Sequence, residues 1–255
     1  MARRRGRADV SHSEEAVINL LKSLSEIMRG RAIGGPTVYL RQPHRRDWRS
    51  WVALRSRSHA FLKPWEPTWP KDALTRKAFL RRLRAHALQS HSDAGYAFFV
   101  FRRNDDALLG GITVSNVRRG IAQSCSVGYW IGEPYARRGY MTEALASLLP
   151  FIFENLRLHR IEAAVLPENA ASRALLKKVG FREEGYARQF LRINGEWQDH
   201  VLFGMLAGDP RPVVHTVIEG GRELRPAVAP SGAFAVSSVA APSQNTVGGR
   251  NSSTA

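Results

Sequence analysis

The stretch Tyr129-Trp-Ile-Gly-Glu-Pro-Tyr-Ala-Arg-Arg-Gly-Tyr-Met-Thr-Glu-Ala144 decides how the rest of this chain is interpreted. It predicts a strand that runs into a short loop, with a helix starting directly after Gly139. The free backbone N–H groups at a helix start favour an anion, and a glycine lets the main chain come close to a ligand. Arg137 and Arg138 add positive charge. The loop therefore suits a pyrophosphate, although an ordinary strand-to-helix turn with two solvated arginines gives the same pattern.

The same order of strand, polar turn and helix returns at residues 163–181. Asn169 and Ser172 place an amide and a hydroxyl on the first turn of the predicted helix, and Gly180 is typical of a helix end. A capping role alone would account for Asn169. Two such turns in one chain favour a shared ligand over two unrelated caps.

The elements around these turns predict one α/β domain. Apolar runs bounded by turn residues predict strands at 37–41, 96–102, 108–116, 122–131, 160–165, 181–193 and 200–205. Helical patterns cover 45–61, 74–89, 142–155 and 170–179. Strands grouped first, and later alternating with helices, predict a mixed (α+β) sheet covered by helices.

Composition divides the chain into three parts. Residues 1–35 combine an arginine cluster with an amphipathic helical pattern, and residues 36–206 form the predicted domain. Residues 207–255 are rich in Pro, Ala, Ser and Gly and are predicted to be a disordered tail. We interpret the arm as a helix that packs on the body, with RNA or partner binding as the alternative.

The charge balance favours an anionic partner. The 255 residues carry 38 basic and 22 acidic side chains, which gives a formal net charge of +16. Within 36–206 there are 27 basic and 15 acidic residues, so the domain alone carries +12. Nearly all the basic residues are arginines, whose planar guanidinium groups suit phosphate.

The single cysteine and the hydropathy pattern limit the cell compartment. Cys125 alone can form neither an intramolecular disulfide nor a cysteine-based zinc site. The longest apolar stretch, 144–153, is about half of what a membrane-spanning helix needs. Asp9 and Glu14 follow the basic start where a signal peptide needs an apolar segment. These features predict a cytoplasmic protein with no metal and no membrane partner.

Six separated segments resemble the GCN5-related N-acetyltransferases, and within them the RimJ/RimL-type acetyltransferases of ribosomal-protein N-termini. The resemblance covers roughly residues 36–206. The segments are Phe61-Leu-Lys-Pro-Trp-Glu-Pro67, Gly128-Tyr-Trp-Ile131, Arg138-Gly-Tyr-Met-Thr-Glu-Ala144, Pro167-Glu-Asn-Ala-Ala-Ser172, Lys178-Val-Gly-Phe181 and Ile193-Asn-Gly-Glu-Trp-Gln-Asp-His200.

The resemblance implies acetyl-CoA as the donor and a central, mostly antiparallel sheet with helices on both faces. The pyrophosphate would lie at the loop 136–141, and the pantetheine arm between the strands that end near Ile131 and Val165. The loop departs from the family pattern at Ala136 and Met141, so an adjacent arginine is expected to replace the missing side chain. The implied coenzyme-binding residues are Trp130, Ile131, Ala136, Arg137, Arg138, Gly139, Tyr140, Met141, Thr142, Asn169 and Ser172.

The catalytic groups common in the family are missing here. Its glutamate base falls at Ser126 and its tyrosine acid at Leu176. Ser126 is therefore expected to position a water, and Ser172 or water to supply the proton for the departing thiolate. Glu66 is the preferred carboxylate for binding or deprotonating the substrate amine, with a salt bridge as its alternative role.

Several other residues are predicted to be structural rather than catalytic. Tyr129 is interpreted as a packing aromatic and Cys125 as a small buried hydrophobe. Asp199 and His200 are expected to orient a hairpin near the substrate mouth. Glu133 and Glu168 remain open as further carboxylates that the fold can bring to the site.

The missing base favours one substrate class. A protein α-amine has a pKa of about 7.7–8.0, whereas a lysine amine at about 10.4 loses its proton at greater cost. The leading prediction is transfer of acetyl to a protein N-terminal α-amine, with a ribosomal protein as the implied substrate and ribosomal RNA attracted by the basic domain. The alternatives are acetylation of a small-molecule amine and a non-catalytic ribosome- or RNA-associated protein on the same fold.

Overall fold

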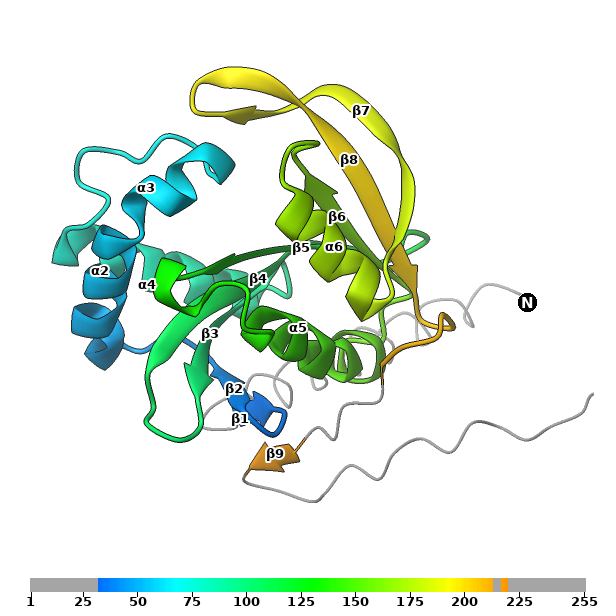
Figure 1. Ribbon diagram of the computed structural model, residues 1–255. Coiled ribbons are helices and arrows are strands. Elements are labelled where there is room, and N and C mark those ends of the chain that lie inside the picture. The colour runs from blue at the N-terminus through cyan, green and yellow to red at the C-terminus, as the bar shows by residue number, and fades with distance from the viewer. Residues whose placement is uncertain (1–31, 213–216, 220–255) are drawn as a thin grey trace, which may run out of the picture. The chain divides into compact units, whose positions relative to one another are not determined.

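The strands form one mixed sheet in the order β7-β8-β6-β5-β4-β3-β2-β1-β9 (Figure 1). The computed structural model describes residues 32–212 and 217–219. Its strands are β1 (Ala32–Gly34), β2 (Val38–Arg41), β3 (Tyr96–Arg102), β4 (Leu108–Arg118), β5 (Ser124–Ile131), β6 (Arg160–Val165), β7 (Arg182–Ile193), β8 (Glu196–Leu206) and β9 (Val217–Glu219). Within this described sheet, β5 and β6 pair in parallel and every other neighbouring pair is antiparallel. The predicted mixed, mostly antiparallel sheet is confirmed.

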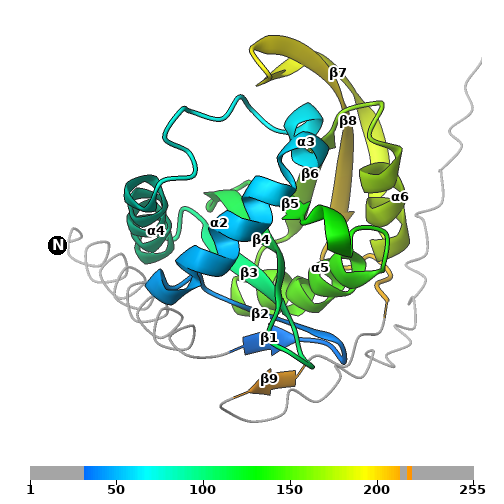
Figure 2. The ribbon, with the colours of Figure 1, turned by 60° about the vertical axis from the view of Figure 1, so that its left-hand side comes forward.

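Helices cover both faces of this sheet (Figure 2). On one face lie α2 and α4, and on the other lie α5 and α6. The helical segments are η1 (Arg45–Asp47), α2 (Trp48–Arg57), α3 (His59–Leu62), η2 (Lys63–Trp65), α4 (Arg76–His91), η3 (Glu133–Tyr135), α5 (Tyr140–Pro150), η4 (Phe151–Asn155) and α6 (Ala170–Val179).

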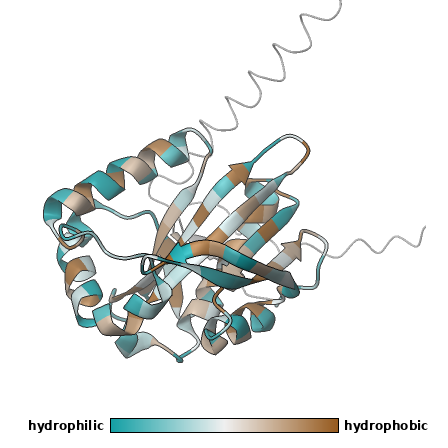
Figure 3. Cartoon of the chain, turned by 90° about the horizontal axis from the view of Figure 1, so that it is seen from above, coloured by the Kyte–Doolittle hydropathy of each residue, from teal (hydrophilic) through white to brown (hydrophobic). Residues whose placement is uncertain are grey.

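The strand β3 shows how the two cores are built. Successive side chains of a strand point to opposite faces of the sheet. Phe98 and Val100 enter the core under α5, while Phe99 and Phe101 pack with Trp51 of α2. Figure 3 shows hydrophobic and hydrophilic bands alternating along the helices and strands. The unbroken apolar run of β3 thus serves two cores at once.

The predicted helix 45–61 is divided, whereas β6 and α6 begin and end at the predicted residues. α2 ends at Arg57 and α3 begins at His59, with the fully buried Ser58 between them. The Ser58 hydroxyl accepts a hydrogen bond from the N–H of Glu133 at 3.0 Å. The break in the helix therefore fixes the loop that follows β5.

The predicted helix 142–155 begins earlier, at Tyr140, and ends as a π-helix over Phe151–Asn155. Pro150 has no N–H to donate to the carbonyl one turn back, so the regular α pattern stops there. The N–H of Leu156 instead donates to the carbonyl of Phe151, five residues back, at 2.9 Å.

Two short strands extend the sheet beyond the predicted domain 36–206. Ala32 pairs with Glu219 and Gly34 with Val217, so β1 and β9 form its outer edge. The sequence analysis assigns these residues to the arm and the tail, because three-residue strands carry almost no pattern. The predicted arm helix and the rest of the predicted tail lie outside the described residues.

The parallel strands β5 and β6 separate partway along their length (Figure 1). Their pairing covers only Ser124–Ser126 and Arg160–Glu162. Beyond that point β5 stays paired with β4 as far as Ile131, and β6 stays paired with β8 as far as Val165. The two facing edges have no strand partner there, so their backbone groups can bond an extended molecule laid between them.

Candidate active site

The loop after β5 leads into α5 with a backbone shaped for an anion. Arg137 and Gly139 both have positive φ values, of 60° and 83°, and Gly139 is the N-cap of α5. A Cβ at Gly139 would meet no heavy atom within 4 Å, so the main chain is open to a ligand there. Left-handed residues turn successive N–H groups toward one point, next to the positive end of the helix dipole. This geometry fits the predicted pyrophosphate site.

The two departures from the family loop pattern have simple structural outcomes. Met141 is buried, and its side chain belongs to the core beneath α5 rather than to the loop surface. Ala136 is half-buried, and its N–H donates to the carbonyl of Glu133 at 3.2 Å. Arg137 and Arg138 are both exposed. Neither departure places a side chain over the open backbone at Gly139.

A pair of hydroxyl groups spans the opening between β5 and α6. The Oη of Tyr129 lies 2.7 Å from the Oγ of Ser172. Asn169 is the N-cap of α6, and its Oδ1 accepts from the N–H of Ser172 at 3.1 Å. Burial raises the pKa of Tyr129 to about 12, so this phenol remains protonated at neutral pH. The structure therefore brings Asn169 and Ser172 together and adds Tyr129, which the sequence analysis treats as packing.

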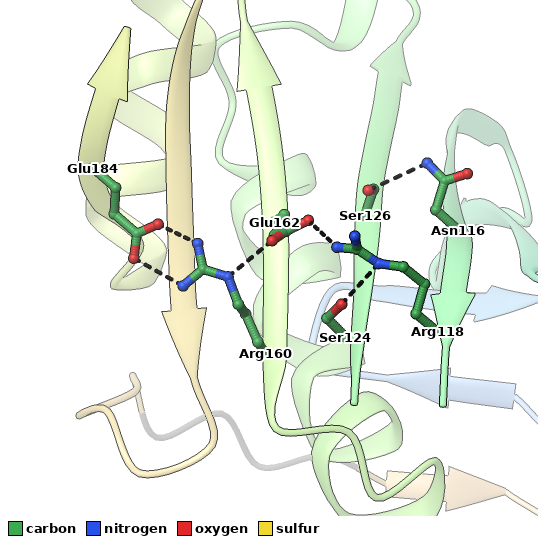
Figure 4. A network of polar contacts seen from close by, with 7 residues as sticks. All are labelled: Asn116, Arg118, Ser124, Ser126, Arg160, Glu162 and Glu184. Carbon is green, nitrogen blue, oxygen red and sulfur yellow. Dashed lines mark hydrogen bonds and ion pairs between the residues drawn. The ribbon is translucent and has the colours of Figure 1, made fainter. Parts of the chain in front are cut away.

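Ser126 lies on the opposite face of β5 from Cys125, at the point where β5 and β6 separate. Its Oγ accepts a hydrogen bond from the Nδ2 of Asn116 at 3.4 Å (Figure 4). Its register partner on β6 is Glu162. Cys125 is fully buried, which confirms the predicted small buried hydrophobe, and burial raises the pKa of its thiol to about 12.

Glu162 is a carboxylate beside the candidate site that the sequence analysis does not name. It accepts from Arg118 at 2.8 Å and from Arg160 at 3.0 Å, and Arg160 continues to Glu184 (Figure 4). The two arginines and two glutamates, on β4, β6 and β7, therefore alternate in charge and compensate each other. The strand alternation of β6 could have placed Glu162 on the same face as Ser126, but nothing in the spacing indicates its two arginine partners.

Glu66 takes the salt-bridge role that the sequence left open. Its two carboxylate oxygens accept from the guanidinium of Arg55 at 2.7 and 2.6 Å, and one of them also accepts from the Nε1 of Trp69 at 2.7 Å. The Arg55 guanidinium lies 4.2 Å from the ring centroid of Trp69 and 4.8 Å from that of Trp130. Glu66 thus fixes the loop after η2 against β5.

A cavity of about 340 Å³ opens beside this cluster. It lies between α2, α4, the loop after η2 and the strands β3 to β5. Arg55, Glu66 and Trp130 contribute to its wall, so two of the predicted site residues face one cavity. The other lining residues are Pro43, Trp51, Pro67, Thr68, Trp69, Pro70, Ala73, Leu74, Arg82, His86, Ala97, Phe98, Phe99, Gly111 and Thr113.

The hairpin of β7 and β8 reaches across to the opposite side of the site. The Nδ2 of Asn194, at the tip of the hairpin, donates to the carbonyl of Lys63 at 2.9 Å. Asp199 accepts from the hydroxyl of Tyr186 and from the N–H of Gln189, both at 2.7 Å. The predicted hairpin-orienting role of Asp199 agrees with these contacts.

Two negative findings apply to residues 32–212 and 217–219. This part of the chain contains no group of three or more His, Cys, Asp or Glu side chains that could hold a metal ion. None of its helices is long and apolar enough to cross a membrane.

Comparison with known families gives a match over most of the described region. The family described as "Acetyltransferase (GNAT) domain" matches residues 37–182. This range includes the loop before α5, the N-terminus of α6 and the cavity.

Individual relatives extend the match beyond that range. The chain is 34% identical over 174 residues to the "[Ribosomal protein uS5]-alanine N-acetyltransferase" of Escherichia coli, covering 68% of this chain and 89% of that protein. It is 33% identical over 175 residues to the "Probable N-acetyltransferase YjcK" of Bacillus subtilis, covering 69% and 97%. A solved structure described as "Mycobacterium smegmatis RimJ in complex with CoA-disulfide" aligns with a TM-score of 0.65 at 33% identity, covering 69% of this chain and 87% of that one.

Proposed function

Because this chain belongs to the GNAT acetyltransferase family, we propose that it transfers acetyl from acetyl-CoA to the N-terminal α-amine of a protein, with a ribosomal protein as the substrate. The chain is an N-acetyltransferase that uses acetyl-CoA; the protein N-terminus is the proposed part. The observation that carries it is the 34% identity to the uS5-alanine N-acetyltransferase of Escherichia coli, which spans 89% of that enzyme.

The backbone geometry supports one placement of the donor. We assign the pyrophosphate to the N–H groups of residues 137–142 and the pantetheine arm to the opening between β5 and β6. The solved relative from Mycobacterium smegmatis holds a CoA-disulfide, which agrees with a coenzyme site in this fold. The Nδ2 of Asn169 makes no hydrogen bond with any described residue, so it is available to the amide groups of the arm.

The reaction then needs only modest help from side chains. The amine nitrogen attacks the thioester carbonyl, the C–N bond forms, the C–S bond breaks, and the amine loses a proton while the sulfur gains one. We assign to Ser172 the hydrogen bond to the departing sulfur. A proton from solvent reaches the sulfur through this hydroxyl, so that CoA leaves as the free thiol. Tyr129 holds that hydroxyl in place.

Glu66 and Glu162, two described carboxylates beside the candidate site, are both engaged in ion pairs. The Glu66 carboxylate is held by Arg55 and Trp69, and Glu162 is compensated by two arginines. Ser126 is suited only to positioning a water. An α-amine is already partly neutral at pH 7, whereas a lysine amine is not. These contacts support an α-amine as the acceptor.

The experiment combines the purified protein, isotopically labelled acetyl-CoA and dissociated ribosomal proteins, with peptide mass spectrometry to locate each new acetyl group. We expect label on the α-amine of one or a few proteins. Label on lysine side chains, or turnover only with small amines, contradicts the proposal. A parallel assay uses intact ribosomal subunits in place of the dissociated proteins. If the net charge of +12 on residues 36–206 holds the enzyme near ribosomal RNA, the rate of acetylation should rise at low salt.

A further inference from the structure

Arg82 of α4 is a cation without a carboxylate partner in the wall of the cavity. Its guanidinium lies 5.5 Å from the ring centroid of Trp51, and no carboxylate of the described residues lies within ion-pair distance of it. The Arg82 side chain is exposed and lines the open side of the cavity; desolvation of its guanidinium and then repulsion by Arg55 lower its pKa, while the nearby Glu66 carboxylate raises it. An anion in the cavity would offset both effects.

The other charges around the cavity do not supply that anion. Arg55 and Glu66 neutralise each other through two hydrogen bonds. His86 lies one helical turn after Arg82 and also lines the cavity. Burial lowers the pKa of His86, and its Nδ1 lies 3.5 Å from the Oε1 of Gln89, so the one N–H of the neutral ring is directed to that amide oxygen. The cavity wall therefore carries one net positive charge, that of Arg82.

The cavity is close to the place where the acceptor amine must lie. Thr113 is the register partner of Gly128, and Gly111 that of Trp130, so all four share one face of the sheet. A Cβ at Gly128 would meet nothing within 4 Å, so this face is open at the mouth of the gap between β5 and β6. Residues i and i+2 of a strand, such as Gly128 and Trp130, are about 7 Å apart. This distance is roughly that spanned by one amino-acid residue and its side chain, so one acceptor can reach both positions.

We propose that this cavity binds a carboxylate of the acceptor, carried within one or two residues of the reacting amine, with Arg82 as its main contact. The inference rests on the proposed function, since it selects among α-amine acceptors. Two sources share this chemistry: an acidic side chain near a protein N-terminus, and the α-carboxylate of a free amino acid or dipeptide. Three tryptophans lie in the wall (Trp51, Trp69 and Trp130), and their apolar rings strengthen an ion pair made against them.

The test compares matched acceptors. Peptides that begin Ala-Asp or Ala-Glu are assayed beside the same peptides with Asn or Gln at that position, and free alanine and the dipeptide Ala-Ala beside their C-terminal amides. Enzymes are the wild type, Arg82→Gln, and Arg84→Gln as the control. Arg84 is exposed and two residues further along α4, on the opposite side of the helix, so its replacement removes the same charge outside the cavity.

We expect wild-type kcat/KM to be about tenfold higher for the acidic member of at least one pair, and Arg82→Gln to reduce that ratio toward one while Arg84→Gln keeps it. A preference among peptides identifies a side chain, and a preference for the free acid over its amide identifies an α-carboxylate. Turnover of acidic and amide acceptors at equal rates, or an equal ratio in both variants, overturns the inference while leaving the proposed function intact.

If no α-amine is acetylated, the proposed function fails, and calorimetric titration of the same peptides in the presence of CoA tests the cavity alone. Tighter binding of the acidic peptide that is lost in Arg82→Gln supports the carboxylate site. Equal dissociation constants for both peptides overturn it.

Discussion

The hydroxyl of Ser172, at the start of α6, lies 2.7 Å from the hydroxyl of Tyr129 on β5. The contact joins two elements that otherwise face each other across the opening between β5 and β6. It is short enough for a full hydrogen bond, and both groups are uncharged at neutral pH. The pair can therefore stabilise a departing thiolate without adding a charge to the site.

Replacing Ser172 by Ala is expected to lower kcat about 10- to 100-fold, because the developing thiolate loses its hydrogen-bond donor. The KM for acetyl-CoA should change little, since the backbone of α6 still binds. Initial-rate measurements with thiol detection check this. Tyr129→Phe, which removes only the supporting hydroxyl, should cost less than Ser172→Ala; an unchanged kcat in Ser172→Ala would assign protonation to water alone.

Replacing Gly139 by Val is expected to weaken acetyl-CoA binding at least tenfold. The φ of 83° strains any β-branched residue by about 1–2 kcal/mol, and the side chain would cover the open N–H groups. Gly120→Val is the matched control, because Gly120 also has positive φ and an open Cβ direction but lies in the turn between β4 and β5. Equal loss of affinity in both variants would trace the effect to stability alone.

Replacing Glu66 by Ala is expected to lower the free energy of unfolding by about 2–3 kcal/mol, because the largely buried Arg55 loses its counter-ion. Thermal unfolding checks this. The pH dependence of kcat should keep its shape in Glu66→Ala. A base at Glu66 would give the reverse result, with unchanged stability, a kcat lowered more than 100-fold and a lost acidic limb in the pH profile.

Cys125 is expected to resist thiol reagents in the folded protein. Its side chain is fully buried, and burial raises the pKa of the thiol to about 12, so almost no thiolate is present at pH 8. Spectrophotometric thiol titration should give less than one tenth of the reaction rate of the denatured chain. Rapid labelling in the folded state would show that the core around β5 opens on the time scale of the assay.

Much of the fold could be predicted because its pattern is local. The apolar alternation of β6 and the capped, glycine-ended pattern of α6 give exact bounds at 160–165 and 170–179. The strands β1 and β9 could not be predicted, because each has only three residues and they pair with each other from opposite ends of the described sequence. The π-helix after Pro150 could not be predicted either, because its first residues continue the apolar pattern of the preceding α-helix.

The site was predictable where backbone shape decides it and unpredictable where side chains pair over long distances. Gly139 and Asn169 mark helix starts that the sequence identifies directly. The partner of Glu66 is 11 residues away on another helix, and the partner of Tyr129 is 43 residues away. Arg82 has no motif at all, because its importance comes from the cavity around it.

The pairing of β1 with β9 has a consequence for how the protein is made. A chain leaves the ribosome from its N-terminus, so β1 emerges early and its neighbour on the outer side emerges only after the rest of the described domain. Until Val217 is synthesised, that side of β1 presents unpaired backbone groups to other chains. Among the described strands β9 is therefore the last to join the sheet, and any pause in synthesis before it prolongs the interval in which this edge is open.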